Sequence, residues 1–274
     1  MTGLAVAGYG AGALVMGPLA AFGMAIAGVP ATFAALGLMY LAVIVLAGRF
    51  HVDPPQAIPA LSRAAAVARG REYGVAEAVR TPRFWMLWTL LFVNVSAGIM
   101  VLSQVSPMAQ EIAGLSPFAA TGMIGLISLA NAAGRVFWAW VSDAIGRAEV
   151  FALLFAIQAV TFVVLPALRD PALFGTALAL VGLCFGGGFG TMPSFTADVF
   201  GATHMGGIYG WMLLAWSCAA IPSPLFIAHV RQATGHHDPA LYLLAGVLLC
   251  ATLIPLLARR PAAERAAALP STTR

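Results

Sequence analysis

Charged residues are scarce in this chain. Only 9% of its 274 residues are Asp, Glu, Lys or Arg, whereas about a quarter are charged in soluble domains. Hydrophobic residues make up 61% of the chain, and the mean hydropathy is +0.92. The apolar residues run in long unbroken blocks, such as 31–48, and do not alternate with polar ones as in the strands of a transmembrane β-barrel. The composition excludes a soluble domain and predicts a protein embedded in a lipid bilayer.

Lysine is absent, and all 14 basic residues are arginine. They are dispersed among the polar connections and form neither a basic stripe nor a known nucleic-acid motif, so the net charge of +4 does not indicate a nucleic-acid partner. We interpret the arginines instead as determinants of orientation in a membrane.

Motifs of enzymes and metal sites are lacking as well. The three cysteines, Cys184, Cys218 and Cys250, lie in apolar blocks without the spacing of a zinc site or a disulfide framework. A His-His-Asp run at 236–238 has no further ligand nearby in the sequence, and we expect it to be solvated. There is no Ser/His/Asp order, no HExxH motif and no pair of Asp residues in an apolar block. We therefore expect neither an enzyme nor a metal or cofactor.

Eight apolar blocks, separated by Pro, Gly and charged residues, can each form a membrane helix of about 20 residues. The first two are joined by a Gly-Val-Pro link so short that they must form a tight hairpin. We therefore predict an all-α polytopic membrane bundle of about eight transmembrane helices. The blocks lie near 3–28, 31–48, 84–105, 118–141, 150–168, 172–195, 207–229 and 240–258.

The arginines divide unequally between the two sides of this bundle. Eleven fall on one side, in the connection 49–83, at Arg147 and in the tail 259–274, against only Arg169 and Arg231 on the other. By the positive-inside rule, the richer side is cytoplasmic. Both termini are then cytoplasmic, as an even number of spans requires. We expect a multi-pass protein of the inner membrane.

The connection 49–83 is the one long polar segment between blocks. It separates a two-helix piece, 1–48, from a six-helix piece, 84–258, and the tail 259–274 follows. Its last part, 72–83, is either an amphipathic helix on the anionic cytoplasmic leaflet or a solvated linker.

The most informative motif is NAAGRVFWAWVSDAIGR at 131–147, which spans the predicted cytoplasmic junction between the fourth and fifth blocks. Gly146 permits a sharp turn, Asp143 can accept hydrogen bonds from a helix N-terminus, and Arg147 can pair with a carboxylate across the loop. We interpret these three residues as a conformational latch. Asp198 is interpreted as a charge that caps a loop.

This motif resembles the signature loop between the second and third helices of each half of the major facilitator superfamily, in the copy of the second half. Other segments resemble its oxalate/formate antiporter branch. They are RTPRFW at 80–85, QVSPMAQ at 104–110, GGGFGTMPSFTAD at 186–198 and IYGWMLLAW at 208–216.

The resemblance implies a transporter of two six-helix halves, with a substrate site between them near the midplane. Counted against that plan, 1–48 matches the fifth and sixth helices, and 84–258 matches the whole second half. The first four helices have no counterpart, which a fragment, a mis-called start codon or a truncated gene would explain. Alternatively, a partner or self-association replaces them, or the chain does not transport.

Arg135 is the principal candidate for binding substrate. An arginine inside a membrane helix costs about 2.5–3.5 kcal/mol, so such a residue is a functional candidate. It shares one helix face with Thr121, Ser128 and Asn131, and a guanidinium can bind a carboxylate through two hydrogen bonds. From spacing alone, Arg135 can equally extend to the cytoplasmic surface or support the latch. The resemblance implies that it binds the substrate carboxylate.

Trp216 matches the position of a second cation, a lysine, in the oxalate exchangers of the family. One guanidinium neutralises a monocarboxylate but leaves half of a dianion unpaired, so formate, pyruvate or lactate is favoured over oxalate. Trp216 and Tyr209, with Trp211, either form an aromatic wall of the site or pack as anchors. Asn94 and Gln104 either line the same cavity or bind neighbouring helices.

Small residues recur at helical spacing in two blocks. In the first, Gly8, Gly12 and Pro18 resemble the Gly-Pro motif of antiporters, but we interpret them mainly as residues that pack against another helix. In the sixth, Gly182, Gly186 and Gly190 form a ridge for close packing or a hinge. The latch motif, Arg135 and the family resemblance together predict secondary active transport of a small monocarboxylate by alternating access, as antiport or proton-coupled symport.

Overall fold

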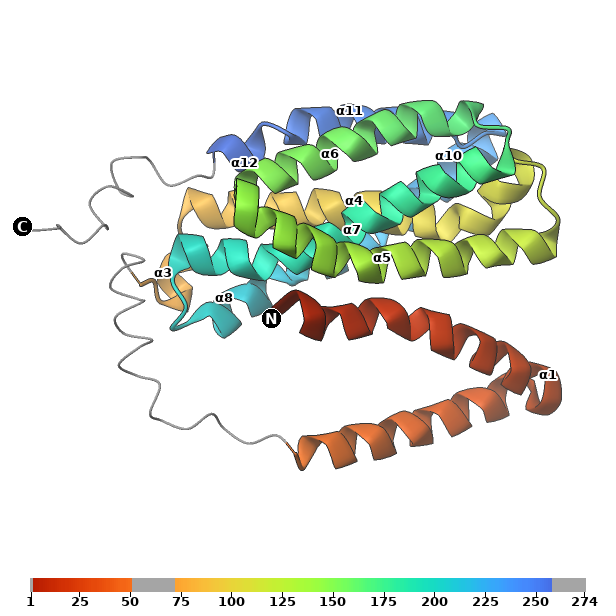
Figure 1. The fold of residues 1–274 in the computed structure, drawn as a ribbon, viewed down its shortest axis with the longest axis horizontal. Helices are drawn as coiled ribbons and strands as arrows, with labels where there is room; N and C mark the ends of the chain where they lie inside the picture. Colours follow the sequence, from red (N-terminus) through yellow and green to blue (C-terminus); the bar gives the residue numbers. More distant parts are fainter. Residues whose placement is uncertain (1, 51–71, 258–274) are drawn as a thin grey trace, which may run out of the picture.

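The structure is a computed structural model that describes residues 2–50 and 72–257, with side chains given except at 2–11, 13–15, 18 and 256. In these ranges every regular element is helical (Figure 1). The elements are α1 (Thr2–Gly48), α3 (Val75–Val79), α4 (Pro82–Glu111), α5 (Pro117–Ile145), α6 (Arg147–Val164), the 3-10 helix η1 (Leu165–Ala167), α7 (Pro171–Phe200), α8 (Met205–Met212), α9 (Leu214–Ala220), α10 (Pro222–Thr234), α11 (Asp238–Ala251) and α12 (Ile254–Leu257).

Six of the described helical segments are long and apolar enough to cross a membrane, which confirms the predicted membrane bundle. The predicted count of about eight is approximate, because the described span in α1 begins only at Leu19 and α11 has 14 residues. The six are Leu19–Gly48, Pro82–Glu111, Pro117–Ile145, Arg147–Ala167, Pro171–Phe200 and Met205–Thr234.

The first two apolar blocks form two arms of α1 that meet at a bend (Figure 1). Gly28 has a non-helical backbone with φ of 76°, a conformation that residues with a Cβ rarely adopt. Thr32 donates a hydrogen bond to the Gly28 carbonyl over 2.8 Å, and its side chain lies where a Cβ on Gly23 would stand. The bend therefore lies at the Gly-Val-Pro link where the hairpin was predicted.

Three of the long helices begin in the same way, with a polar N-cap residue followed by proline. Thr81 accepts from the Phe84 amide at the start of α4, Ser116 from the Ala119 amide at the start of α5, and Asp170 from two amides at the start of α7. Proline suits the next position because its missing N–H has no partner in the first turn. These short polar signals position the helices that carry the candidate site.

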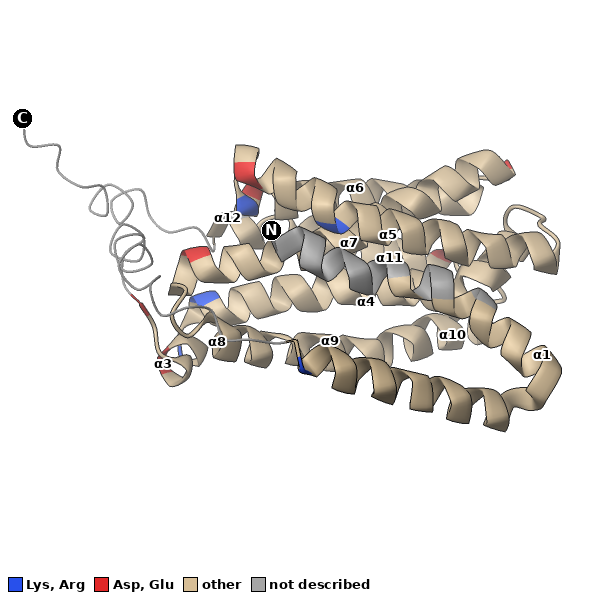
Figure 2. Ribbon diagram, turned by 60° about the horizontal axis from the view of Figure 1, so that its bottom comes forward, with Lys and Arg blue, Asp and Glu red and all other residues tan. Residues whose placement is uncertain are grey.

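The core lies among α4, α5, α6 and α7, with α9, α10 and α11 packed around them. Phe84 of α4, Phe151 of α6 and Phe174 of α7 are each at most 1% exposed. The second arm of α1 instead exposes large apolar side chains such as Phe33 and Leu38. Charged residues lie mainly toward the helix ends (Figure 2). This distribution suits a surrounding of lipid and other membrane helices.

The end of the long connection packs on the bundle. The Tyr73 amide donates to the Phe200 carbonyl over 3.0 Å, and the Glu72 carboxylate accepts from the amides of Ala202 and Thr203. The helix in this segment, α3, has only five residues, and its Ala78 is buried. The segment therefore packs on the bundle and is not merely a solvated linker, whereas its contact with the cytoplasmic leaflet stays a prediction. Residues 51–71 of the connection and the tail 259–274 lie outside the described residues.

Candidate functional site

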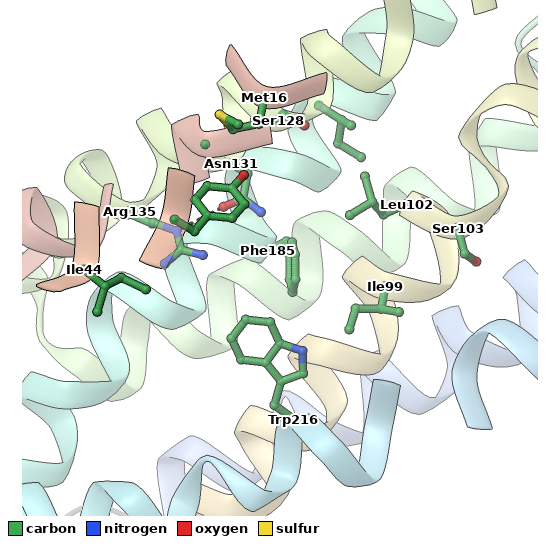
Figure 3. Close-up of a pocket in the computed structure, with 13 residues that line it drawn as sticks. Met16, Ile44, Ile99, Leu102, Ser103, Ser128, Asn131, Arg135, Phe185 and Trp216 are labelled. Carbon is green, nitrogen blue, oxygen red and sulfur yellow. Dashed lines mark hydrogen bonds between the residues drawn. The ribbon is translucent and has the colours of Figure 1, made fainter. Parts of the chain in front are cut away.

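A cavity of about 1030 Å³ lies between the two arms of α1 and helices α4, α5, α7 and α9 (Figure 3). Its walls are mostly apolar, and the charged side chain among its described lining residues is Arg135. The lining residues are Gly12, Met16, Tyr40, Ile44, Ile99, Leu102, Ser103, Ile127, Ser128, Asn131, Arg135, Phe185 and Trp216.

Arg135 lies well inside α5 and is only 2% exposed. Its Nε donates to Asn131 Oδ1 over 3.1 Å, one helical turn earlier. The guanidinium carbon stands 5.0 Å from the centre of the Phe189 ring, within the range of a cation–π interaction. Figure 3 shows the guanidinium beside Asn131 in the cavity wall. The amide and the ring therefore restrict the orientation of a buried cation that faces an apolar space.

Close contact between α5 and α7 sets the position of this arginine. A Cβ on Gly182, Gly186 or Gly190 would collide with the backbone carbonyl oxygen of Ile127, Asn131 or Arg135, respectively. The three glycines recur every four residues, and so do their three partners, so one helix lies directly on the backbone of the other. Replacing any of these glycines would push α5 away from the ring of Phe189.

Phe185 and Trp216 line the cavity, and the Phe189 ring packs against both of them. The ring centres of Phe189 and Trp216 are 4.9 Å apart, and those of Phe185 and Phe189 are 5.5 Å apart. Phe185 and Phe189 were not among the sequence-predicted site residues. Their spacing of four residues in the glycine-rich block was the available signal, because it places both rings on one face of α7.

Asn94 does not line the cavity. It is fully buried, and its amide donates to the Phe185 carbonyl over 3.1 Å, so it joins α4 to α7 behind the cavity wall. Gln104 lies against His237 at the end of the bundle. Asn94 and Gln104 were predicted either to line the cavity with Asn131 or to bind neighbouring helices. In the structure both side chains contact neighbouring elements.

The other polar and aromatic candidates are dispersed. Tyr209 is half-buried on α8, within electrostatic range of Arg135, whereas Trp211 is 54% exposed. Thr121 is exposed and donates to its own helix, at the Pro117 carbonyl. Of the small residues in the first block, Gly12 lines the cavity, but Gly8 and the Pro18 side chain lie outside what the structure describes.

The motif residues Asp143, Gly146 and Arg147 meet where α5 turns into α6. Gly146 separates the helices with a φ of 105°, in the region that favours glycine. Arg147 pairs with Asp143 and with Asp198 of α7, whose carboxylate lies 3.4 Å from Nε, and also donates to the Ser142 hydroxyl. Asp198 was interpreted as a loop cap, but it takes part in this cluster. We call the end of the bundle with these residues the latch end.

At the opposite end, which we call the far end, His237 differs from expectation. The sequence was taken to indicate a solvated loop, but His237 is 2% exposed and its Nδ1 lies 3.0 Å from a Glu111 carboxylate oxygen. Glu111 also pairs with Arg231 of α10. Within the described ranges, no three His, Cys, Asp or Glu residues are grouped so as to hold a metal ion.

Comparison with known proteins adds to this geometry. A family model described as Major Facilitator Superfamily matches residues 1–224. The chain is 31% identical over 223 residues, 80% of its length, to the "Oxalate:formate antiporter" of Oxalobacter formigenes, of which this covers 52%. It is 27% identical over 226 residues, 81% of its length, to the "Uncharacterized MFS-type transporter YhjX" of Escherichia coli, of which this covers 54%.

A third relative is the "Apicoplast pyruvate carrier 1" of Toxoplasma gondii, with 28% identity over 158 residues, 56% of this chain and 29% of that protein. The chain spans about half the length of the first two relatives.

Proposed function

This chain belongs to the Major Facilitator Superfamily, and we propose that it takes part in secondary active transport of a small organic monocarboxylate, with Arg135 as the group that binds the anion. Membership of this family points to a membrane transporter rather than an enzyme. The observation that carries the proposal is a buried arginine in the wall of a mostly apolar cavity. A bound anion would offset the positive charge of such a buried residue.

The charge of the site favours a monoanion. Moving an ion from water into an apolar protein site costs several kcal/mol, which a partner of opposite charge must offset. Arg135 can provide two parallel N–H bonds to one carboxylate. Trp216 also lines the cavity. The resemblance implies that oxalate exchangers carry a lysine at this position. A dianion would leave its second carboxylate against aromatic rings, so formate, pyruvate or lactate fits better than oxalate.

The latch end suits alternating access. Arg147 joins α6 to Asp143 of α5 and Asp198 of α7, and side chains in this cluster are partly exposed. Exposed ion pairs contribute only about 0–1 kcal/mol each, so a modest change in binding energy can open them. We propose that the cluster closes the cytoplasmic side in one state and separates in the other, with both termini on that side of an inner membrane.

Uptake into proteoliposomes tests this function. Labelled formate, pyruvate, lactate and oxalate are offered to the 274-residue chain, with and without the same anion inside. Saturable uptake of a monocarboxylate is expected, and stimulation by internal anion would identify exchange rather than symport. Arg135→Gln should abolish uptake. Arg80→Gln, which removes an exposed arginine elsewhere, is the matched control and should leave uptake unchanged.

Equilibrium binding to the purified chain in nanodiscs separates two ways of failing. The chain spans about half the length of its relatives, which favours a second candidate, a half that works only with a partner or a second copy. Binding without uptake would support that candidate. Neither binding nor uptake by correctly inserted protein would refute Arg135 as the anion site of this chain.

A further inference from the structure

The far end of α4 is held from three sides. Glu111, the last residue of α4, pairs with Arg231 of α10 and contacts His237, the residue immediately before α11. Arg169 lies between η1 and α7, and its guanidinium donates over 3.3 Å to the backbone carbonyl of Ile112, the residue after Glu111. The two arginines that the sequence assigned to the poorer side of the membrane thus both bind the same helix end. Such convergence restrains the position of α4 relative to its neighbours.

A proline gives α4 a point near its far end at which the helix can bend. Pro107 lies inside α4, and a proline within a helix removes one backbone hydrogen bond and permits a kink. The cavity-lining residues Ile99, Leu102 and Ser103 come shortly before it. The segment from Pro107 to Glu111 therefore connects the cavity wall to the contacts at the far end.

His237 is the titratable member of this cluster that is almost completely enclosed. Its side chain is 1% exposed, against 35% for Glu111 and 40% for Arg231. Nδ1 lies 3.0 Å from a Glu111 carboxylate oxygen, and Nε2 lies 3.5 Å from the side-chain oxygen of Gln104. A neutral imidazole with its hydrogen on Nδ1 donates to the carboxylate and needs no second charge beside Arg231. Its Nε2 is then an acceptor, which the Gln104 amide can satisfy by turning its nitrogen toward the ring.

Three charged groups act on this imidazole, and a second histidine is its neighbour in the sequence. Glu111 faces it from α4, Arg231 from α10 and Asp238 from α11, and His236 precedes it in the loop. Burial lowers the pKa of His237 below its usual value near 6.5, Arg231 acts in the same direction, and Glu111 and Asp238 oppose them. The enclosed residue thus binds protons less readily than it would in water.

We propose that Glu111, Arg231 and His237 form a pH-sensitive clasp that holds the segment 107–111 of α4 against α10 and α11 and opens when the far end is acidified. In the open clasp, His237 is solvated and regains an ordinary proton affinity. The closed clasp binds fewer protons, so it is stable above about pH 6.5 and is lost as the pH falls below that value. The consequence for transport, altered access to the Arg135 cavity, rests on the proposed function.

The clasp is tested without transport by measuring the distance between spin labels on α4 and α10. Gln110→Cys and Ala233→Cys place labels at exposed positions on either side of the clasp, after Cys218→Ser and Cys250→Ser remove the exposed native thiols. The label pair is measured in nanodiscs between pH 8 and 5. We expect a longer distance to appear on acidification, with the ratio of open to closed states changing by up to about tenfold per pH unit.

Two histidine variants make the result specific. His237→Asn keeps a neutral hydrogen-bonding group and should remove the pH dependence, whereas His236→Asn, at the exposed neighbour, should retain it. Glu111→Gln removes the carboxylate and should give the longer distance at every pH. A pH-independent distance in the wild type would overturn the proposal, and so would unchanged pH dependence in His237→Asn.

Uptake with the pH varied on one side at a time then tests the link to transport. A dependence on the pH at one side alone, lost in His237→Asn and kept in His236→Asn, would support it. If the chain shows neither uptake nor anion binding at any pH, the proposed function fails, but the label distances still decide whether the clasp exists.

Discussion

Arg135→Lys separates the geometry of the anion site from its charge. Lysine keeps the positive charge, but it lacks the planar group that donates to Asn131 over 3.1 Å and stands 5.0 Å from the Phe189 ring centre. It also offers no pair of parallel N–H bonds to a carboxylate. Loss of one hydrogen bond to a charged group costs about 1.5–3 kcal/mol. At about 1.4 kcal/mol per factor of ten, the Kd for pyruvate should rise by roughly 10- to 150-fold.

The assay is equilibrium binding of labelled pyruvate at pH 7 to the purified chain in nanodiscs. Affinity should fall from wild type to Arg135→Lys and again to Arg135→Gln, which has no charge. Ser128→Ala is the control, because the Ser128 hydroxyl lies in the same wall but donates to the Ile124 carbonyl of its own helix. Equal affinities in wild type and Arg135→Lys would refute the argument that orientation matters, and binding unaffected in Arg135→Gln would refute the site itself.

Three further predictions concern the cavity, the packing and the latch. Trp216→Lys adds a cation to the cavity wall and should raise uptake of oxalate relative to formate, measured as a ratio of initial rates. Gly186→Ala places a Cβ against the backbone of α5 and should destabilise the protein by about 1–3 kcal/mol in thermal unfolding, while Gly122→Ala, with open space around it, should not. Asp198→Asn removes one carboxylate from Arg147 and should increase the labelling of cysteines introduced at the latch end; unchanged labelling would argue against a latch.

Much of the fold could be predicted from local sequence patterns. The apolar blocks predicted the membrane helices because a span of lipid must be crossed by a continuous run of apolar residues with satisfied backbone groups. The hairpin followed from a short link with glycine, and Gly28 is where the helix breaks. The turn at Gly146 and the pairing of Arg147 with a nearby carboxylate could be predicted for the same reason, and the structure shows that Asp143 is one of its partners.

The contacts between helices could not be predicted in this way. Asn94 and Asn131 are both amides on membrane helices, yet Asn94 is sealed against α7 and Asn131 faces the cavity. His237 was expected to be solvated, but it is 2% exposed and contacts Glu111 and Gln104 of α4. Rotation and depth of each helix decide these outcomes, and they depend on packing between residues that are distant in sequence.

The sequence by itself determined that this protein is a helical membrane protein, where its helices begin and turn, and that one arginine lies within a span. Helical periodicity, capping and hydrophobicity act within a few residues of each other, so they are readable along the chain. Only the tertiary structure decided that Arg135 stands against the Phe189 ring, that Asp198 joins Arg147, and that Glu111 meets His237. These pairings arise from the close contact of whole helices, where glycines without side chains permit it.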